Sequence, residues 1–159
     1  DLRQFPYYDN YVDLTRMEMH AIFSVILRQP RMIAFLGSGP LPLSSICLVE
    51  ALHKHNPRCP VQIHNIDWDP IAVNLSSQLC QRLGGSCKAM RFACADIANE
   101  LRDLREFDVI FLAALVGNSS AEKERIAASV SCRMRAGAIM VLRSSHSLRS
   151  LLYPVWARS

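Results

Sequence analysis

The chain has 159 residues, half of them hydrophobic, and a formal net charge of +4. This length fills one domain with a sizeable core and is too short for two. Lysine and arginine are scattered without a basic run, which argues against nucleic-acid binding, and no apolar run approaches the roughly 20 residues of a membrane span. The start of the chain has no basic-then-apolar signal pattern, so we expect a soluble cytoplasmic protein.

The first predicted element is a helix over residues 10–28. Glu18 falls on its apolar side, beside Leu14 and Ile22, where a carboxylate must find a partner. By pattern alone, an ion pair with an arginine such as Arg143 is favoured over a role as general base. The polar face of the same helix carries Asp13, Arg16, His20, Ser24 and Arg28.

The next element is a strand over residues 31–36 that ends in Gly37 and Gly39. Glycines let the backbone turn sharply and approach a ligand, and Ser44 or Ser45 is expected to cap the following helix. This order of strand, glycine turn and helix is typical of nucleotide-binding turns, although many α/β proteins use it as plain turn chemistry.

Apolar runs and helical patterns alternate along the rest of the chain, which predicts parallel strands joined by crossover helices. The expected fold is α/β and Rossmann-like, with a doubly wound, mostly parallel sheet. Strands are expected at residues 31–36, 61–66, 87–94, 107–115 and 138–142, and helices at 44–55, 70–83, 97–104, 119–135 and 146–156.

Strand ends carry the candidate binding residues, because ligands of such sheets lie beyond the carboxyl ends of the strands. Asp67 is the preferred ligand for ribose hydroxyls, since Asp69 stands before a proline and suits a helix cap. Asp96 is either an acceptor for the adenine amine, with Ile97 packed on the ring, or a cap for the next helix. The small residues at 113–117 suit either a ligand chain or the core.

The six cysteines include no CxxC pair and no histidine at ligand spacing, so we expect reduced thiols, mostly in the core, and no metal site. They are Cys47, Cys59, Cys80, Cys87, Cys94 and Cys132.

Five segments resemble nicotianamine synthases, enzymes that join aminocarboxypropyl groups from S-adenosylmethionine on a fold of the class I methyltransferase type. The loop GSGPLPL at 37–43, with two stiffening prolines, is the most specific. The other segments are FPYYDNYVDLTRME (5–18), NIDWDPIAVNLSSQL (65–79), FDVIFLAALVG (107–117) and RAGAIMVLRSSHSLRSLLYPV (135–155).

The resemblance implies that S-adenosylmethionine is the substrate, that no other cofactor is needed, and that Glu18 is the catalytic base. Tyr8 and Tyr11, with Tyr7, are candidates to wall the same pocket, or they pack with their hydroxyls at its rim. Ligand contacts are expected at the glycine turn, from Gly37, Ser38, Gly39 and Pro40, and at the small residues Ala113 and Ala114. Substrate carboxylates need cationic partners, for which Arg143 and His146 are candidates. In this family the chemistry serves nicotianamine biosynthesis and metal homeostasis.

The family's helical N-terminal domain and its final strands have no counterpart in the sequence. We therefore expect a fold truncated at both ends, made of an N-terminal helical segment (1–30) and a Rossmann-like domain (31–159). An unpaired sheet edge would favour homo-oligomers. The alternatives are a methyltransferase on the same fold and an inactive fragment that binds S-adenosylmethionine.

Overall fold

The computed structural model describes residues 2–113, 115–143 and 150–154, which form one mixed sheet with helices on both faces. The strand order is β3-β2-β1-β4-β5-β6, and the winding direction reverses between β1 and β4. Neighbouring strands from β3 to β5 are parallel, and β6 is antiparallel to β5. The strands are β1 Met32–Leu36, β2 Gln62–Asp67, β3 Met90–Cys94, β4 Val109–Leu112, β5 Ile139–Arg143 and β6 Ser150–Pro154.

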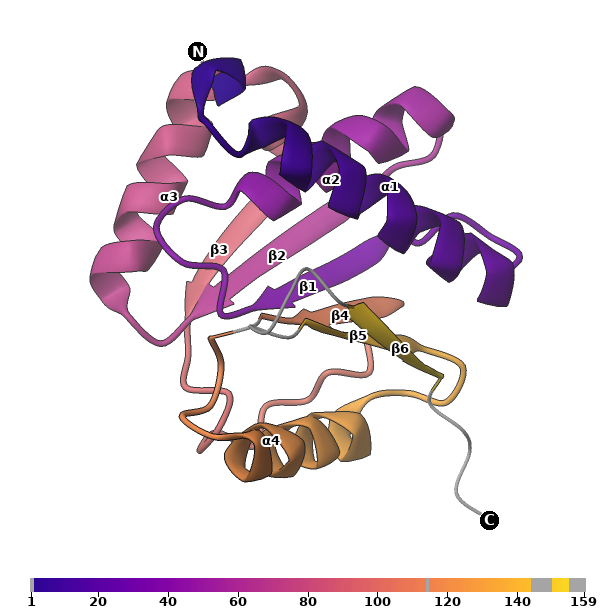
Figure 1. The fold of residues 1–159 in the computed structure, drawn as a ribbon, viewed down its shortest axis with the longest axis vertical. Helices are drawn as coiled ribbons and strands as arrows, with labels where there is room; N and C mark the ends of the chain where they lie inside the picture. The colour runs from indigo at the N-terminus through magenta and orange to yellow at the C-terminus, as the bar shows by residue number, and fades with distance from the viewer. Residues whose placement is uncertain (1, 114, 144–149, 155–159) are drawn as a thin grey trace.

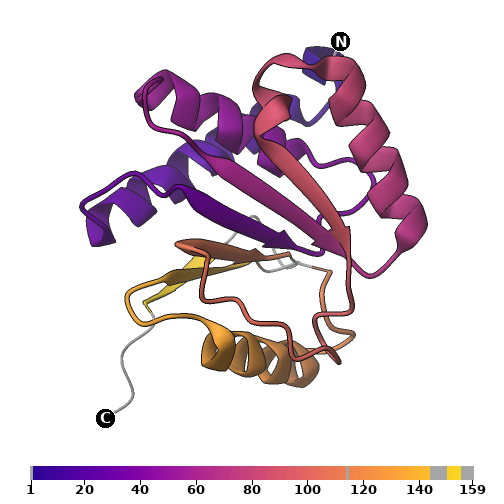
Figure 2. The same ribbon diagram turned by 180° about the vertical axis from the view of Figure 1, so that it is seen from behind.

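Three helices cover one face of the sheet and one helix covers the other (Figures 1 and 2). The first group comprises α1 (Tyr8–Val25), α2 (Leu43–His55) and α3 (Pro70–Leu83), and α4 (Ser120–Arg133) lies on the opposite face. Two short 3-10 helices, η1 (Leu2–Gln4) and η2 (Gly85–Ala89), complete the described elements. The predicted Rossmann-like arrangement is confirmed.

Alternate side chains of β1 enter two different cores. Ile33 and Phe35 pack in the cluster beneath α1 and α2, whereas Ala34 and Leu36 pack in the cluster beside α4. A parallel strand covered by helices on both faces needs a continuous apolar run, which is what residues 32–36 provide. The sequence signal at this strand was therefore reliable.

The predicted serine cap of α2 is wrong. Pro42 occupies the N-cap position without a side-chain hydrogen bond, so both serines fall inside the first turn. The Ser44 hydroxyl accepts a hydrogen bond from Arg143, and the Ser45 hydroxyl donates one to Oδ1 of Asn65. Tertiary partners on the sheet therefore take the side chains that were expected to cap the helix.

The predicted helix over 97–104 is also wrong, since the chain makes only a turn at 97–99 and then continues irregularly. Its backbone finds partners on α4: the Ile97 and Glu100 carbonyls accept hydrogen bonds from the Arg133 guanidinium at 3.0 and 2.6 Å. The N–H of Leu104 donates to the carbonyl of Arg133 at 3.2 Å. These long-range bonds replace the local ladder of a helix.

At the end of the chain, the predicted helix over 146–156 is contradicted where the structure describes it. Residues 150–154 form β6, paired antiparallel to β5, and the rest of that range lies outside the described residues. β6 also covers the edge of β5 that we expected to be unpaired. One further strand of the sheet is therefore present.

All six cysteines are free thiols, but the expectation of mostly core positions holds for only three of them. Cys47, Cys80 and Cys87 are buried, whereas Cys94 and Cys132 are exposed.

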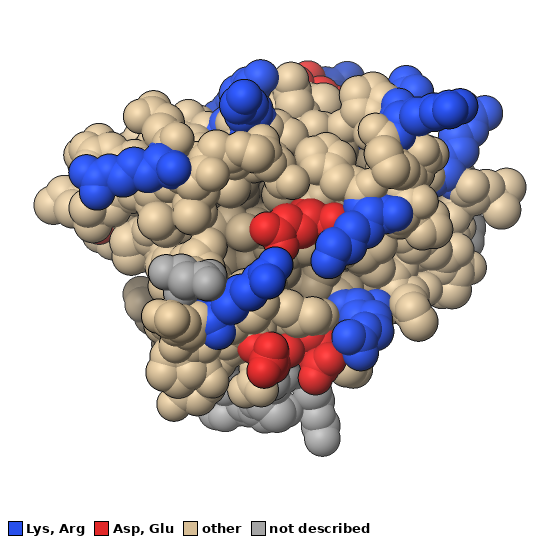
Figure 3. All heavy atoms as spheres, turned by 90° about the horizontal axis from the view of Figure 1, so that it is seen from above, with Lys and Arg blue, Asp and Glu red and all other residues tan. Residues whose placement is uncertain are grey.

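Among the helices that the structure describes, none has the length and hydropathy needed to cross a membrane. Positive and negative side chains are interspersed on the face seen from above in Figure 3.

Asp108 connects the starts of three strands at the end of the sheet opposite the glycine turn. Its Oδ2 accepts the N–H groups of Arg31 and Met32 at 2.7 and 2.9 Å, and its Oδ1 accepts from Arg135. Burial raises the pKa of this carboxyl, but the two backbone donors and the guanidinium outweigh burial and hold the pKa below its ordinary value.

We expect Asp108→Asn to lower the free energy of unfolding at pH 7 by about 1 to 2 kcal/mol. A lowered pKa in the folded state contributes stability above the unfolded value, near pH 4, and that stability is lost as the pH falls through the folded value. The difference between wild type and variant should therefore shrink in urea titrations below about pH 4. An equal difference at every pH would contradict this role, and Asp13→Asn, at an exposed carboxylate, is the control.

Candidate functional site

The turn after β1 has the geometry of a ligand-binding loop. Gly37 and Gly39 have φ values of 80° and 69°, which favour glycine. A Cβ on Gly37 would lie 2.5 Å from Cγ2 of Val116, so the turn packs tightly against the loop after β4. A Cβ on Gly39 would have no neighbour within 4 Å, so that backbone faces open space.

Asp67, the last residue of β2, holds this turn in place. Its Oδ2 accepts the Gly39 N–H at 2.8 Å and its Oδ1 accepts the Asp69 N–H at 3.0 Å. The residue is only 8% exposed, yet it lines the cavity at the strand ends. Each carboxylate oxygen has a further lone pair with which it can accept a hydroxyl hydrogen.

Asp69 has the capping role that the sequence favoured. Its side chain accepts the Ile71 N–H at 2.9 Å, and Pro70 occupies the first position of α3. Among the described residues, Asp69 is not part of the cavity lining. The structure thus separates the two aspartates into a cavity carboxylate and a helix cap.

The turn after β3 brings Asp96 and Ile97 to the same cavity. Oδ1 of Asp96 accepts the Ala98 N–H at 3.1 Å, and Oδ2 accepts from the Asn99 side chain at 2.7 Å. Asp96 therefore caps a turn instead of the predicted helix. Ile97 is 7% exposed and presents an apolar surface to the cavity.

The ends of β4 and β5 are tied together by Lys123 of α4. Its Nζ donates to the carbonyls of Ala113 and Arg143 at 2.7 and 2.6 Å. Burial lowers the pKa of this amine. Ala113 lies next to Gly37 rather than in the cavity lining, and Ala114 lies outside the described residues.

Together these segments enclose a cavity of about 410 Å³ at the point where the sheet reverses direction. That volume lies in the range of small-molecule sites. Of the predicted contacts, Gly37, Gly39, Asp67, Asp96 and Ile97 line it, whereas Ser38 and Pro40 do not.

The residues of the cavity lining that sequence reasoning missed include Trp68, Asn118 and Glu122. Trp68 is 74% exposed, and Leu115 on the opposite loop is 90% exposed, so two large apolar side chains border the cavity. An aromatic residue between two aspartates at a strand end was the available signal for Trp68. Glu122 resembles a residue that only caps the start of a helix, and its side chain does accept the Asn118 N–H at 2.7 Å.

A second cluster lies at the end of β5. Glu18, which is 3% exposed, accepts hydrogen bonds from Nε and Nη2 of Arg143 at 2.9 and 2.8 Å. Nη1 of Arg143 donates to the Ser44 hydroxyl. The ion pair that the pattern favoured for Glu18 is therefore present, and His146, the other predicted carboxylate partner, lies outside the described residues.

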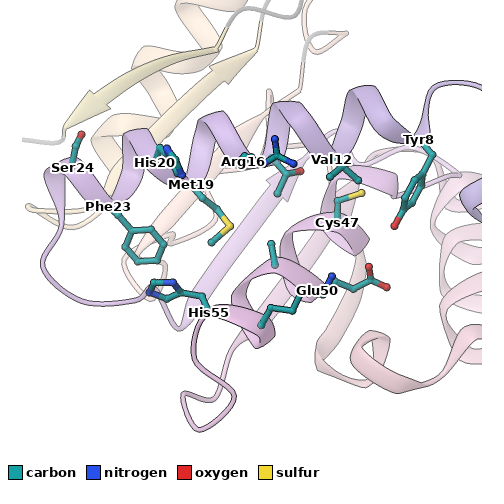
Figure 4. A pocket seen from close by; sticks show the side chains of 13 residues that line it. Tyr8, Val12, Arg16, Met19, His20, Phe23, Ser24, Cys47, Glu50 and His55 are labelled. Carbon is teal, nitrogen blue, oxygen red and sulfur yellow. The ribbon is translucent and has the colours of Figure 1, made fainter.

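Tyr8 does not join this cluster. It lines a separate groove of about 800 Å³ between α1 and α2, drawn in Figure 4, with Tyr8 and Glu50 at one end and Phe23 and His55 at the other. Burial raises the pKa of the Tyr8 phenol, and the negative charge of Glu50 adds to the shift. Tyr11 stands two helical turns before Glu18 and so shares its helix face.

The described residues include no group of three or more histidine, cysteine, aspartate or glutamate side chains arranged to hold a metal ion. The chemistry available at the strand ends is therefore that of carboxylates, backbone amides, the Arg143 guanidinium, the Lys123 amine and apolar walls. Such a set binds a polar molecule with a flat apolar part and provides a buried proton acceptor.

Comparison with known proteins identifies related chains. The family model described as "Nicotianamine synthase protein" matches residues 1–159. Nicotianamine synthase 2 of Arabidopsis thaliana is 39% identical over 154 residues, which cover 97% of this chain and 47% of that protein. Nicotianamine synthase of Solanum lycopersicum is 38% identical over 155 residues, with coverages of 97% and 47%. The chain spans about half the length of these relatives.

Solved structures agree on the fold. The crystal structure of MtNAS in complex with MTA and tNA superposes with a TM-score of 0.69 and 25% identity, over 89% of this chain and 47% of that chain. An S-adenosylmethionine-dependent methyltransferase from Clostridium acetobutylicum superposes with a TM-score of 0.60 and 15% identity, over 89% of this chain and 52% of that chain.

Proposed function

This chain belongs to the nicotianamine synthase family, and we propose that it transfers the 3-amino-3-carboxypropyl group of one S-adenosylmethionine to the α-amine of another, with release of methylthioadenosine. The MTA bound to MtNAS corresponds to that by-product. The observation that carries the proposal is a carboxylate buried to 3% exposure, Glu18, at the same edge of the sheet as the cavity lined by Gly39 and Asp67.

In the proposed complex the nucleoside occupies the strand-end cavity. Asp67 accepts the ribose hydroxyls, while Asp96 accepts the adenine amine and Ile97 packs on the ring. Trp68 covers the open side of the nucleoside. The methionyl chain passes the turn of Gly37, Ser38, Gly39 and Pro40 and runs towards residues 113 and 114.

The proposed reaction is a substitution at carbon. The neutral α-amine of the acceptor attacks the methylene carbon by which the aminocarboxypropyl chain of the donor is attached to the sulfonium. A C–N bond forms, and the bond between this carbon and sulfur breaks with its electron pair on sulfur. The proton lost from the amine goes to Glu18. Tyr11, on the same helix face, is the more suitable tyrosine to wall this reaction, because Tyr8 lies in the α1–α2 groove. The product class connects the protein with metal homeostasis, and the proposed location is the cytoplasm.

Mass spectrometry after incubation of the chain with S-adenosylmethionine tests this function. Methylthioadenosine and a condensed amino acid product should form together, above the background of heat-denatured protein. S-adenosylhomocysteine as the main product would instead indicate methyl transfer. Methylthioadenosine without a condensed product would contradict the proposal.

The glycine turn makes a prediction with a matched control. Gly39 and Gly85 both have positive φ and open space where a Cβ would lie, but only Gly39 lines the cavity. Alanine at either position should cost about 1 kcal/mol of stability. Only Gly39→Ala should weaken S-adenosylhomocysteine binding, by roughly tenfold, because strain at this positive φ would shift the turn and the N–H that anchors Asp67. Equal affinities of the two variants in calorimetry would exclude the turn from the site.

A further inference from the structure

Arg143 connects β5 to both α1 and α2. Its Nε and Nη2 donate to the two carboxylate oxygens of Glu18 at 2.9 and 2.8 Å, and its Nη1 donates to Ser44. The side chains of Arg143 and Glu18 are only 13% and 2% exposed. Both oxygens of the proposed base are therefore engaged by one guanidinium.

This pairing conflicts with a base that is simply waiting for its substrate. An amine that gives its proton to Glu18 has to compete with the guanidinium for the same oxygens. If the pair opened with nothing in its place, two buried charges would lose their partners, which is strongly unfavourable. Something else has to satisfy Arg143 when Glu18 acts.

We infer that Arg143 exchanges one carboxylate for another: the α-carboxylate of the bound amino acid substrate displaces Glu18 from the guanidinium, and the released Glu18 becomes the proton acceptor. This inference rests on the function proposed above. The exchange keeps the charge and the two parallel hydrogen bonds at Arg143, because a substrate carboxylate has the same planar pair of oxygens as Glu18.

The surroundings of Arg143 suit a guanidinium that stays in place while the carboxylate bound to it changes. Its guanidinium carbon lies 5.5 Å from the ring centroids of both Phe35 and Phe111, which stack on each other at 4.3 Å. Its carbonyl accepts from Lys123 at 2.6 Å. Contacts with the two rings and Ser44 position the guanidinium, and Lys123 fixes the backbone of Arg143, so this arginine has contacts besides Glu18.

The position of Arg143 also suits the length of the substrate. The order β2-β1-β4-β5 places three strand spacings between the end of β2, with Asp67, and the end of β5, with Arg143. Because neighbouring strands lie about 4.8 Å apart, this separation is roughly 14 Å. An extended molecule with ribose hydroxyls at one end and an amino acid carboxylate at the other can span it.

The exchange makes the proton acceptor available only when a carboxylate-bearing substrate is present. The acceptor amine then loses its proton to Glu18 as the new C–N bond forms. After the product leaves, Glu18 releases the proton to water and pairs with Arg143 again. Nucleosides without the amino acid chain leave the Glu18–Arg143 pair closed.

Calorimetry with two unreactive ligands tests the exchange. S-adenosylhomocysteine has the amino acid carboxylate, and methylthioadenosine lacks it. Glu18→Gln should raise the affinity for S-adenosylhomocysteine roughly tenfold, because a charged competitor for Arg143 is removed. Arg143→Lys should lower that affinity by about tenfold, because the forked donor is lost. Affinity for methylthioadenosine should stay the same in both variants.

The outcomes separate this inference from the function on which it rests. If Glu18→Gln leaves the affinity for S-adenosylhomocysteine unchanged or lowers it, while methylthioadenosine binds normally, the exchange is overturned and the nucleoside site stands. If neither ligand binds the wild-type chain, the proposed function is overturned, and the inference with it.

A measurement on the wild-type chain does not depend on how the variants fold. With carbon-13 in the glutamate side chains, the carboxyl resonance of Glu18, assigned from Glu18→Asp, should shift on addition of S-adenosylhomocysteine and stay in place with methylthioadenosine. Equal shifts with the two ligands would overturn the exchange.

Discussion

Arg143→Met is expected to lower the free energy of unfolding by about 3 to 5 kcal/mol, because it leaves the buried Glu18 carboxylate without its guanidinium partner. The side chains of the pair are 13% and 2% exposed, so solvent cannot replace the lost bonds. Urea unfolding monitored by circular dichroism measures the change.

The double variant Glu18→Leu/Arg143→Met makes this prediction specific. Because removing both charges also removes their desolvation penalty, the double variant should regain most of the stability lost in the single variant. A double variant that loses the sum of the two single changes would contradict a dominant pairwise interaction. The exposed pair Asp13–Arg16 on α1 is the control, and Arg16→Met should cost about half a kcal/mol or less.

Arg133→Met is expected to lower the free energy of unfolding by about 2 to 4 kcal/mol. The guanidinium of Arg133 holds the loop at residues 97–104, which lacks the backbone hydrogen-bond ladder of a helix. It donates to the carbonyls of Ile97 and Glu100 at 3.0 and 2.6 Å, and to the carbonyl of Ser129 at 3.1 Å. Because Ile97 lines the nucleoside cavity, affinity for S-adenosylhomocysteine should fall by roughly tenfold as well.

The same helix offers a matched control for Arg133. Arg125 has a side chain 65% exposed and lies 3.8 Å from Glu122, so Arg125→Met should leave both stability and affinity nearly unchanged. Arg133→Lys should recover part of the stability, because one of the carbonyls can still be reached. If Arg133→Met proves as stable as Arg125→Met, the loop does not depend on the guanidinium.

Elements that are set by local interactions were predicted correctly, whereas those set by contacts distant in sequence were not. The helix at the start, β1 and the helices after β2 and β4 were predicted close to their final bounds, because apolar spacing and cap residues act within a few residues. The segment at 97–104 has a helical pattern, yet the carbonyls of Glu100 and Ile97 bond to Arg133, 33 and 36 residues away in sequence. No local signal reports such a partner.

The candidate site divides in the same way. Gly37, Gly39, Asp67, Asp96 and Ile97 were predicted from the sequence because each ends or follows a recognisable strand in a fold whose ligands lie at strand ends, and all five line the cavity. For Glu18 the sequence showed only a carboxylate on an apolar face and left two roles open. Its pairing with Arg143, 125 residues away, follows from packing α1 beside the end of β5.

By itself, the sequence determined the alternation of strands and helices, the glycine turn after β1 and the acidic residue that ends β2. These features depend on backbone sterics and on the spacing of apolar residues, which are local. Only the tertiary structure decided that residues 150–154 pair as a strand, that Tyr8 faces the α1–α2 groove and that Arg143 occupies both oxygens of Glu18. Those outcomes depend on which distant polar groups satisfy one another once the core is packed.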